Sequence, residues 1–416
     1  MSSPPGTGGE PEIVTGSREQ LFHLLAEASE IEHSLMCSYL YAAFSLKSHD
    51  AEGLSAAEGK AVARWRKAIM GVAIEEMGHL MLVANLTVAI GGRPHFARPN
   101  FPVAPGYFPA GVVVRLSGFS AATLDHFIFL ERPLGVERDD PACYEAPDAA
   151  RDQHGAGLMP SAQDYTTIGH LYEAIRQNLS GLVRKLGEQD LFLGGRSTQV
   201  DKAVAGLDGV AAIDDLAGAY AAIDLIVEQG EGSPADREES HYRSFLAVRD
   251  EFTTLLSANP GFEPAWPVAD NPVLRHPPEP QGKVHIDAPE AAAMLDFACA
   301  SYGLLLRVLG QMFGRTGSDI AGDQKTLMSV AFELMHALGA AASELATLPA
   351  STATPQIHAG MSFTMLRGVE PLLADVEAVL LREQLSLLGE ARLASHFTAG
   401  LRDAAAALRL ASDPRR

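Results

Sequence analysis

Cysteine is scarce in this chain of 416 residues, which contains only Cys37, Cys143 and Cys299. Three cysteines do not make a disulfide framework, and their spacing fits no zinc-binding cysteine pattern. Basic side chains are also few, because 32 Lys and Arg stand against 52 Asp and Glu and give a net charge of −20. Nucleic acids and anionic membranes both need a positive patch, so we expect neither as a partner.

Long apolar runs are missing as well. No stretch reaches about 18 apolar residues without a charge, so we expect no membrane span. The first ten residues lack a basic segment followed by an apolar one, which predicts no signal peptide and a cytoplasmic location. What the chain does have is 47% hydrophobic residues and only 20% charged ones, enough to bury a large core and too few charges for wholesale disorder.

Apolar residues recur at steps of three or four through most of the chain, which predicts an all-α protein. We expect a flexible tail over residues 1–16, a first helical domain over 17–258, a proline-rich linker over 259–289 and a second helical bundle over 290–416. Residues 93–160, rich in proline and aromatics, are too long for an ordinary connection. We expect this segment to be a crossover with structure of its own or a lid.

Start and stop signals divide the two domains into helices. Ser17 is a plausible N-cap for the first helix, and Gly91-Gly92 followed by Pro94 ends the second. A short strand is expected over 112–114 and a short helix over 121–130. The remaining helices are expected over 55–90, 161–186, 213–228, 238–256, 291–313, 323–346, 361–388 and 390–411.

The second expected helix carries Glu76 and His79 in an otherwise apolar stretch. Residues at i and i+3 lie on one helix face, about 5–6 Å apart at Cβ, so this carboxylate and imidazole can share a metal ion. A buried acid and a buried histidine need partners, because desolvating charge is costly. A single Glu-x-x-His often lies by chance on a solvated helix face, so this pair alone does not define a site.

Acids and histidines on the other helices complete a pattern. Glu32 lies on the first helix, Glu173 on the third, and His241 on the fourth behind a choice of acids. The order Glu, Glu-x-x-His, Glu, Glu-x-x-His on four successive helices is the ligand pattern of a carboxylate-bridged dimetal site in a four-helix bundle. Such a ferritin-like bundle also needs one long connection between its second and third helices, where residues 93–160 fall.

The fourth helix is interrupted after Glu228, which leaves its carboxylate ligand open. Glu238 has the i, i+3 spacing to His241 but sits in a run of charges. Glu228 follows a clean apolar face and is slightly favoured. Glu231 is a third candidate, because the glycines on both sides leave the backbone free to aim its carboxylate.

Residues 17–250 resemble the ferritin-like domain of the iminophenyl-pyruvate dimer synthase type, and residues 290–370 resemble the region that follows it. This domain occurs in enzymes of bisindole pathways such as those to violacein and rebeccamycin, and in stand-alone bacterial proteins. The resemblance implies a ferritin-like fold and a dimetal site. It is carried by Glu32-His33, Tyr39-Leu40-Tyr41-Ala42, Glu75-Glu76-Met77-Gly78-His79, Gly91-Gly92-Arg93-Pro94, Phe129-Leu130-Glu131-Arg132-Pro133, Ile168-Gly169-His170-Leu171-Tyr172 and Val227-Glu228-Gln229-Gly230-Glu231-Gly232.

Three further residues could contribute to the expected metal site. Tyr39 and Tyr172 are expected to pack in the core, with a second-shell hydrogen bond or a redox relay as the alternative. Glu131 precedes Arg132 and is expected to form a structural ion pair rather than to bind a metal.

Oxygen and nitrogen ligands suit iron or manganese, so we expect two iron ions, or manganese as the alternative, with O₂ or peroxide as co-substrate. The sequence therefore favours an oxidoreductase of specialised metabolism that oxidises or couples a small amino-acid-derived molecule. A non-catalytic metal-binding or scaffold protein is the alternative. A homo-oligomer or a partner oxidase of the same pathway would be compatible with either function.

Overall fold

The protein is described by a computed structural model, in which helices dominate. This confirms the expected all-α class. The described residues are 16–48, 50–51, 53–109, 112–144, 164–230, 240–278, 282–313, 320–373 and 376–411.

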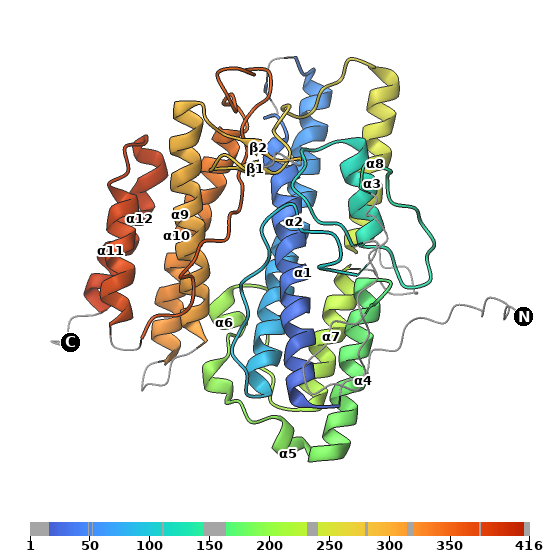
Figure 1. The fold of residues 1–416 in the computed structure, drawn as a ribbon, viewed down its shortest axis with the longest axis vertical. Helices are drawn as coiled ribbons and strands as arrows, with labels where there is room; N and C mark the ends of the chain where they lie inside the picture. Colours follow the sequence, from blue (N-terminus) through green and yellow to red (C-terminus); the bar gives the residue numbers. More distant parts are fainter. Residues whose placement is uncertain are drawn as a thin grey trace, which may run out of the picture.

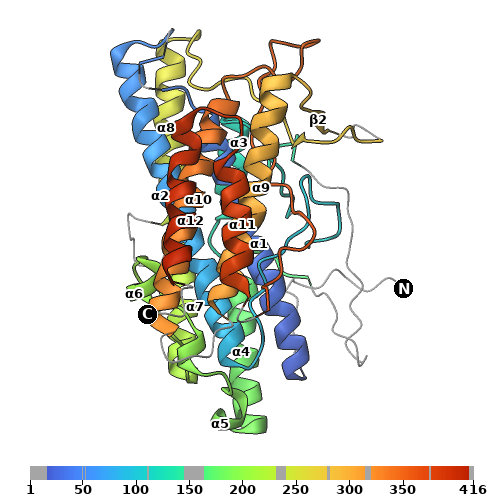
Figure 2. The same ribbon diagram turned by 90° about the vertical axis from the view of Figure 1, so that its left-hand side faces the viewer.

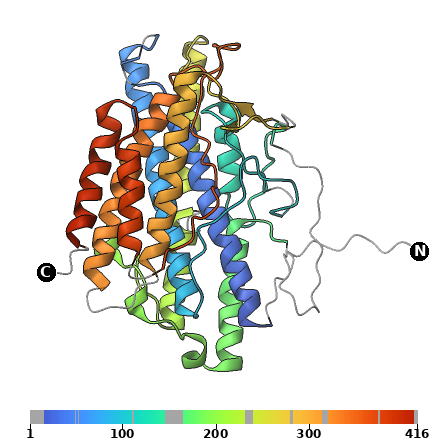
Figure 3. The ribbon, with the colours of Figure 1, turned by 60° about the vertical axis from the view of Figure 1, so that its left-hand side comes forward.

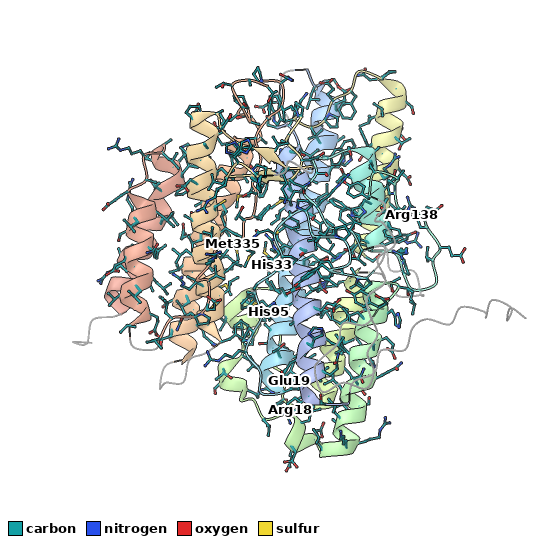
Figure 4. All side chains as sticks on the ribbon, viewed as in Figure 1. Arg18, Glu19, His33, His95, Arg138 and Met335 are labelled. Atoms are coloured by element: carbon teal, nitrogen blue, oxygen red, sulfur yellow. The ribbon has the colours of Figure 1, made fainter. Side chains whose placement is uncertain are left out.

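Two long helices, α1 (Arg18–Ser45) and α2 (Ala56–Ala89), form the antiparallel centre of the molecule. Ser17 caps α1, and Ser55 opens α2 with a reciprocal capping box that satisfies backbone N–H groups otherwise left unpaired. Arg18 donates from Nη1 to the carbonyl of Ile90 over 2.7 Å, which fastens the start of α1 to the end of α2 (Figure 4).

The third and fourth rods of the bundle are each built from two shorter helices. The third consists of α3 (Ala121–Leu130) and α4 (Ile168–Leu186), and the fourth of α7 (Leu216–Gly230) and α8 (His241–Ala258). Figure 1 shows α3 beside α8 in one half of the bundle and α4 beside α7 in the other. Both rods are therefore interrupted at the same level, where helix ends rather than helix middles face the centre.

The connection between the second and third rods is the one expected for a ferritin-like bundle. The ring of Phe119 stacks on Trp65 with 5.5 Å between the centroids, so α3 starts near the start of α2. Gly194, after α4, donates its N–H to the carbonyl of Ala89 at the end of α2 over 2.9 Å. The second and third rods thus run parallel, and residues 90–109 and 112–120 lie in the connection between them. The expected helix over 121–130 is confirmed but belongs to the third rod, and the expected strand over 112–114 does not form.

The C-terminal part adds two further helical pairs on one side of the bundle. The pair α9 (Pro289–Met312) and α10 (Ile320–Leu345) packs against α1, and the pair α11 (Glu377–Gly389) and α12 (Ser395–Ala411) covers it from outside (Figures 2 and 3). One continuous hydrophobic cluster joins all of these layers. The short elements are α5 (Glu188–Leu191), the 3₁₀ helix η1 (Arg196–Thr198), α6 (Lys202–Ala205) and the parallel strands β1 (Pro272–Val273) and β2 (Val284–His285).

One expected helix is half as long in the structure. The sequence pattern predicted helix over 361–388, but 361–373 is not helical and the helix begins only at Glu377. Gly368 and Phe363 have positive φ angles of 76° and 45°, and Pro371 cannot donate a helical hydrogen bond. These three residues end helical geometry locally, and the segment instead lies along α9.

Three helical stretches are long and apolar enough to cross a membrane by length and composition: Ala56–Ala89, Pro289–Met312 and Asp323–Leu345. In this structure 72%, 67% and 50% of their most apolar windows are buried inside the protein. Packing between the layers therefore accounts for most of the apolar surface of α2 and α9.

Asn85 on α2 fixes the loops that lead from α4 to α7. Its side chain is fully buried and donates from Nδ2 to the carbonyls of Val200 and Ala211, over 2.6 and 2.8 Å. Its Oδ1 accepts the N–H of Val200 over 2.9 Å. These bonds set how the chain enters α7, and so where the fourth rod lies.

Replacing Asn85 by Leu should lower the free energy of unfolding by about 3 kcal/mol, because the backbone groups of Val200 and Ala211 would stay buried without partners. Urea unfolding followed by circular dichroism measures this change. The matched control is Gln177→Leu, which removes an exposed amide on α4. Equal losses in both variants would contradict the role given to Asn85.

Candidate metal centre

Five ionisable side chains from four rods converge in the middle of the bundle. They are Glu32 on α1, Glu76 and His79 on α2, Glu131 directly after α3, and His241 as the first residue of α8. None is more than 4% exposed. Their ligand atoms form two groups, each within 4.8 Å: one holds Glu32, Glu76 and His79, and the other Glu76, Glu131 and His241. Figure 4 labels His33, the neighbour of Glu32, near the middle of α1.

Glu76 belongs to both groups and lies between the two imidazoles. Its Oε2 is 3.1 Å from Nδ1 of His79, and its Oε1 is 2.9 Å from Nδ1 of His241. Nδ1 of His79 is also 3.5 Å from Oε2 of Glu32. One carboxylate that offers one oxygen to each side is the arrangement of a bridging ligand between two metal ions.

The second nitrogen of each imidazole is held from outside the cluster. Nε2 of His79 lies 2.9 Å from Oε1 of Gln229, and Nε2 of His241 lies 2.9 Å from Oε2 of Glu75. With the proton on Nε2, each ring donates to its outer oxygen and turns the lone pair of Nδ1 toward the cluster. This is how metal-binding histidines are commonly oriented.

The surroundings of Nδ1 of His241 indicate whether a metal ion fits the cluster. Nδ1 of His241 is buried and has no hydrogen-bond partner, although a Glu76 oxygen is 2.9 Å away. A lone pair aimed at carboxylate oxygens without a hydrogen bond is unfavourable unless a cation lies between them. The donor set of three carboxylates and two imidazoles suits iron or manganese, so these residues fit a metal centre.

Two tyrosines complete the hydrogen bonding of the acids. The hydroxyl of Tyr172 donates to Oε1 of Glu32, and the hydroxyl of Tyr39 donates to Oε1 of Glu131. Burial, together with the neighbouring carboxylates, raises the pKa of both phenols well above 10, so they stay protonated donors. Both tyrosines are buried, as expected of core residues, and each also donates a hydrogen bond to a carboxylate of the cluster, as the alternative interpretation expected.

Without a metal, the cluster divides its protons unevenly. Desolvation and the neighbouring Glu76 raise the pKa of Glu32 to about 8. Desolvation acts the same way on Glu76, but hydrogen bonding with Glu32 and the charges of His241 and His79 outweigh it and hold its pKa well below 4.5. Burial opposes the charge on His79, yet the carboxylates of Glu76 and Glu32 raise its pKa to about 10. At neutral pH the metal-free site therefore carries several protons.

The space between these side chains is small. The cavity has a volume of about 20 Å³, which is about enough for a water molecule or ions. Apolar side chains of Leu35, Ile168, Ile226 and Val227 line it together with the acids. The buried side chains would strengthen metal–ligand interactions, and the space that the described residues enclose suits ions or water.

The structure brings together Glu32, Glu76, His79 and His241 but not Glu173. The carboxylate of Glu173 is exposed on the outer face of α4, where Gln177 donates to it over 3.0 Å. One residue turns a helix by about 100°, so the inward position of Tyr172 turns Glu173 away. The apolar stripe of α4, which includes Leu171, Tyr172 and Ile175, carried this signal in the sequence.

Glu228, the favoured ligand on the fourth helix, does not lie in the cluster either. Glu228 is half-buried on α7 and belongs to neither group of ligand atoms, because α7 presents Ile226, Val227 and Gly230 to the cavity. Gln229 reaches His79 instead. The other two candidates, Glu231 and Glu238, lie outside the described residues.

Glu131 was not expected to bind a metal, but the structure places its carboxylate in the cluster, next to His241. It caps the C-terminus of α3, and its Oε2 lies 3.7 Å from Nδ1 of His241. Glu131 thus supplies the third-rod carboxylate that the sequence pattern assigned to Glu173. The available signal was its place at the end of a short apolar helix, where a buried acid needs a partner.

Comparisons with known proteins agree with this architecture. Dichlorochromopyrrolate synthase of Lentzea aerocolonigenes is 28% identical over 358 residues, which cover 77% of this chain and 33% of that protein. The 2-imino-3-(indol-3-yl)propanoate dimerase of Chromobacterium violaceum is 27% identical over 364 residues, which cover 81% of this chain and 33% of that protein. The chain thus spans about a third of the length of both curated relatives.

The fold has a counterpart among solved structures. A ferritin-like protein of Caulobacter vibrioides superimposes with a TM-score of 0.50 at 18% identity, over 85% of this chain and 100% of the other, which bears on the fold alone. A family model described as ferritin-like matches residues 25–250, the part of the chain that holds Glu32, Glu76, His79, Glu131 and His241. The resemblance noted in the sequence is confirmed by these matches, and the chain belongs to the ferritin-like family.

Proposed function

We propose that this protein is a dinuclear-metal oxidoreductase of specialised metabolism. It would bind two iron ions, with manganese as the alternative, between Glu32, Glu76, His79, Glu131 and His241. The observation that carries the proposal is the buried convergence of these side chains on the shared carboxylate of Glu76. Two bound ions of this kind supply the electrons for reactions of O₂ or peroxide.

The substrate class rests on the two curated relatives. One is named for a chromopyrrolate synthase activity and the other for the dimerisation of an imino-indolyl-propanoate. Both names describe products or substrates with a carboxylate and an aromatic ring derived from an amino acid. We infer oxidation or oxidative coupling of a small amino-acid-derived molecule for this chain as well.

The chain's own residues would prepare the centre rather than react. Gln229 and Glu75 orient the imidazoles, and the hydroxyls of Tyr39 and Tyr172 hold one oxygen of each terminal carboxylate. The apolar residues around the cavity exclude water, which protects reactive species from side reactions.

A non-catalytic metal-binding or partner protein is the second candidate, and one observation favours it. The cavity at the cluster, as the described residues line it, has a volume of about 20 Å³, which suits ions or water better than an organic substrate. The chain also spans only about a third of its curated relatives. Such a protein would bind the same metals without consuming O₂ or peroxide.

Metal analysis with oxygen uptake separates the two functions. We expect about two iron or manganese ions per chain, and nearly complete loss of metal in Glu76→Ala and His79→Ala, because each removes a ligand from a buried site. Glu173→Ala is the matched control and should keep its metal, since its carboxylate is exposed. Mass spectrometry of metals and an oxygen electrode, with aromatic amino and imino acids as substrates, give the readouts.

Metal-loaded protein that consumes neither O₂ nor peroxide with any such substrate would identify the second candidate. Protein that binds no iron or manganese after anaerobic reconstitution, or loses as much metal in Glu173→Ala as in Glu76→Ala, would contradict both functions.

Metal binding should become tighter as the pH rises. Metal ligands must be deprotonated, and the metal-free site holds protons on Glu32, whose pKa is about 8, and on His79, whose pKa is about 10. The apparent affinity should therefore rise from about pH 6 to about pH 8, and binding at neutral pH should release protons into solution. Anaerobic Mn(II) titration with a pH indicator dye counts the protons.

The Glu32→Gln variant tests the source of this dependence. It keeps the shape of the side chain but removes one titrating group, so proton release at neutral pH should fall by about one per chain. An affinity that does not change over this pH range in the unaltered protein would rule out the proton distribution derived for the cluster.

Glu75 and Gln229 should tune the two metal positions separately. Replacing Glu75 by Leu removes the oxygen that holds Nε2 of His241, and replacing Gln229 by Leu does the same for His79. Each change should weaken one of two stepwise metal affinities by about tenfold and leave the other within about twofold. The control is Glu344→Leu, an exposed acid on α10. Calorimetry should show unchanged affinities for the control; equal weakening of both positions by Glu75→Leu would refute separate tuning.

A further inference from the structure

A second cavity, which shares no residue with the metal centre, lies where four distant segments meet. Its volume is about 680 Å³, within the range of small-molecule sites. The crossover contributes Asn100 and Phe101, α9 forms the floor, and Figure 2 shows the strand pair beside α9. The full lining is Asn100, Phe101, Pro272, Val273, Leu274, Arg275, Pro277, Lys283, Asp296, Cys299, Ala300, Ser362, Thr364, Met365, Leu366 and Arg367.

Specific hydrogen bonds hold the walls of this cavity in place. Oδ1 of Asn100 accepts the N–H of Met365 over 2.7 Å, which ties the non-helical segment 361–373 to the crossover. Asn271, at the start of the opposite wall, accepts the N–H of Leu116 over 2.9 Å and donates to the carbonyl of Gly282 over 3.0 Å. The cavity is therefore an organised part of the fold, and hydrogen bonds to Asn100 and to Gln311 of α9 hold segment 361–373 at its edge.

The charge of the cavity is opposite to that of the whole chain. Arg275, Lys283 and Arg367 line it against a single carboxylate, Asp296, in a protein with a net charge of −20. Within the described ranges, no ion pair joins these three cations to an acid. Three cations left without acidic partners beside apolar walls attract an anion.

The walls and the floor define the rest of the ligand. Phe101, Leu274 and Met365 offer apolar surface, which a bare inorganic anion would leave in contact with water. On the floor, Ser362 lies 3.1 Å from the sulfur of Cys299 and 2.8 Å from the hydroxyl of Thr364. Burial raises the pKa of the Cys299 thiol, so this thiol stays neutral and adds no negative charge to that of Asp296.

We propose that this cavity is a binding site for a small organic acid, in which the basic side chains hold the carboxylate and the apolar walls hold the body of the molecule. The assignment does not depend on the metal centre or on the proposed oxidoreductase function. It requires only the described walls, their charge and the size of the cavity.

The probe is 3-phenylpropanoate, with its neutral amide and acetate as matched comparisons. Ligand-observed NMR titration of the full chain should show saturable binding of the acid at millimolar concentration or below. We expect about tenfold weaker binding of the amide, which lacks the charge, and of acetate, which lacks the apolar body. Equal binding of acid and amide, or no saturable binding of the acid, would overturn the proposal.

Variants locate the site. Lys283→Gln combined with Arg367→Gln should weaken binding of the acid about tenfold and leave the amide unchanged. Arg184→Gln with Lys185→Gln, two exposed cations on α4, removes the same charge far from the cavity and should have no effect. A loss of similar size in this control would show general attraction instead of a site.

The metal centre provides the last comparison. Glu76→Ala protein should bind 3-phenylpropanoate as the unaltered chain does, and the cavity variants should keep their full metal content and melting temperature. Binding that disappears in Glu76→Ala would place the acid at the metal cluster and overturn the separate site. Failure of the proposed oxidoreductase activity would leave this result unaffected.

Discussion

Burial of like charges is the constraint on which the centre of this structure depends. Three carboxylates and two imidazoles meet around a cavity of about 20 Å³, and none of these side chains is more than 4% exposed. Without a cation, the protein must keep protons there, as the raised pKa values of Glu32 and His79 indicate. A metal ion replaces those protons and compensates the acids directly. Hydrogen bonds from the two tyrosines to the carboxylates, and the contacts of Gln229 and Glu75 with the imidazoles, restrict how these side chains can be arranged.

The interruptions of the third and fourth rods serve this constraint. At the end of α3, Glu131 turns inward from a position that ends a helix, and His241 does so from the first residue of α8. A side chain at a helix end is less tied to the helical phase than one in the middle, because the backbone beyond it is free to turn. Continuous α1 and α2 provide the rigid half of the site, and the helix ends close it from the other side.

Whether a residue of the cluster could be predicted from the sequence depends on whether it lies within a long helix or at a helix end. Glu76 and His79 could be predicted because helical spacing fixes which residues share a face, and Glu32 because the four-helix ligand order calls for an acid on the first helix; α1 and α2 continue well beyond all three. Glu131 was missed because its role depends on where α3 ends and on which rod α3 extends, and neither follows from local pattern. Glu173 was chosen because the four-helix ligand order calls for an acid on the third helix, although the apolar stripe of α4 turns Tyr172 inward. The all-α class followed from periodicity, but the pairing of α3 with α8 is a long-range contact that no local signal carries.

The two cavities differ in size and in the side chains that line them. The cluster around Glu76 has carboxylates and imidazoles beside a cavity of about 20 Å³, whereas the larger cavity, of about 680 Å³, is lined by three basic side chains with Asp296 and Cys299. Between them, α1 carries Glu32 toward the cluster and His33 toward α9, where Nε2 of His33 lies 2.6 Å from the hydroxyl of Tyr302. Tyr302 is one turn of α9 beyond Cys299 on the cavity floor. The contact between His33 and Tyr302 therefore links the helix that carries Glu32 to the helix that forms the floor of the larger cavity.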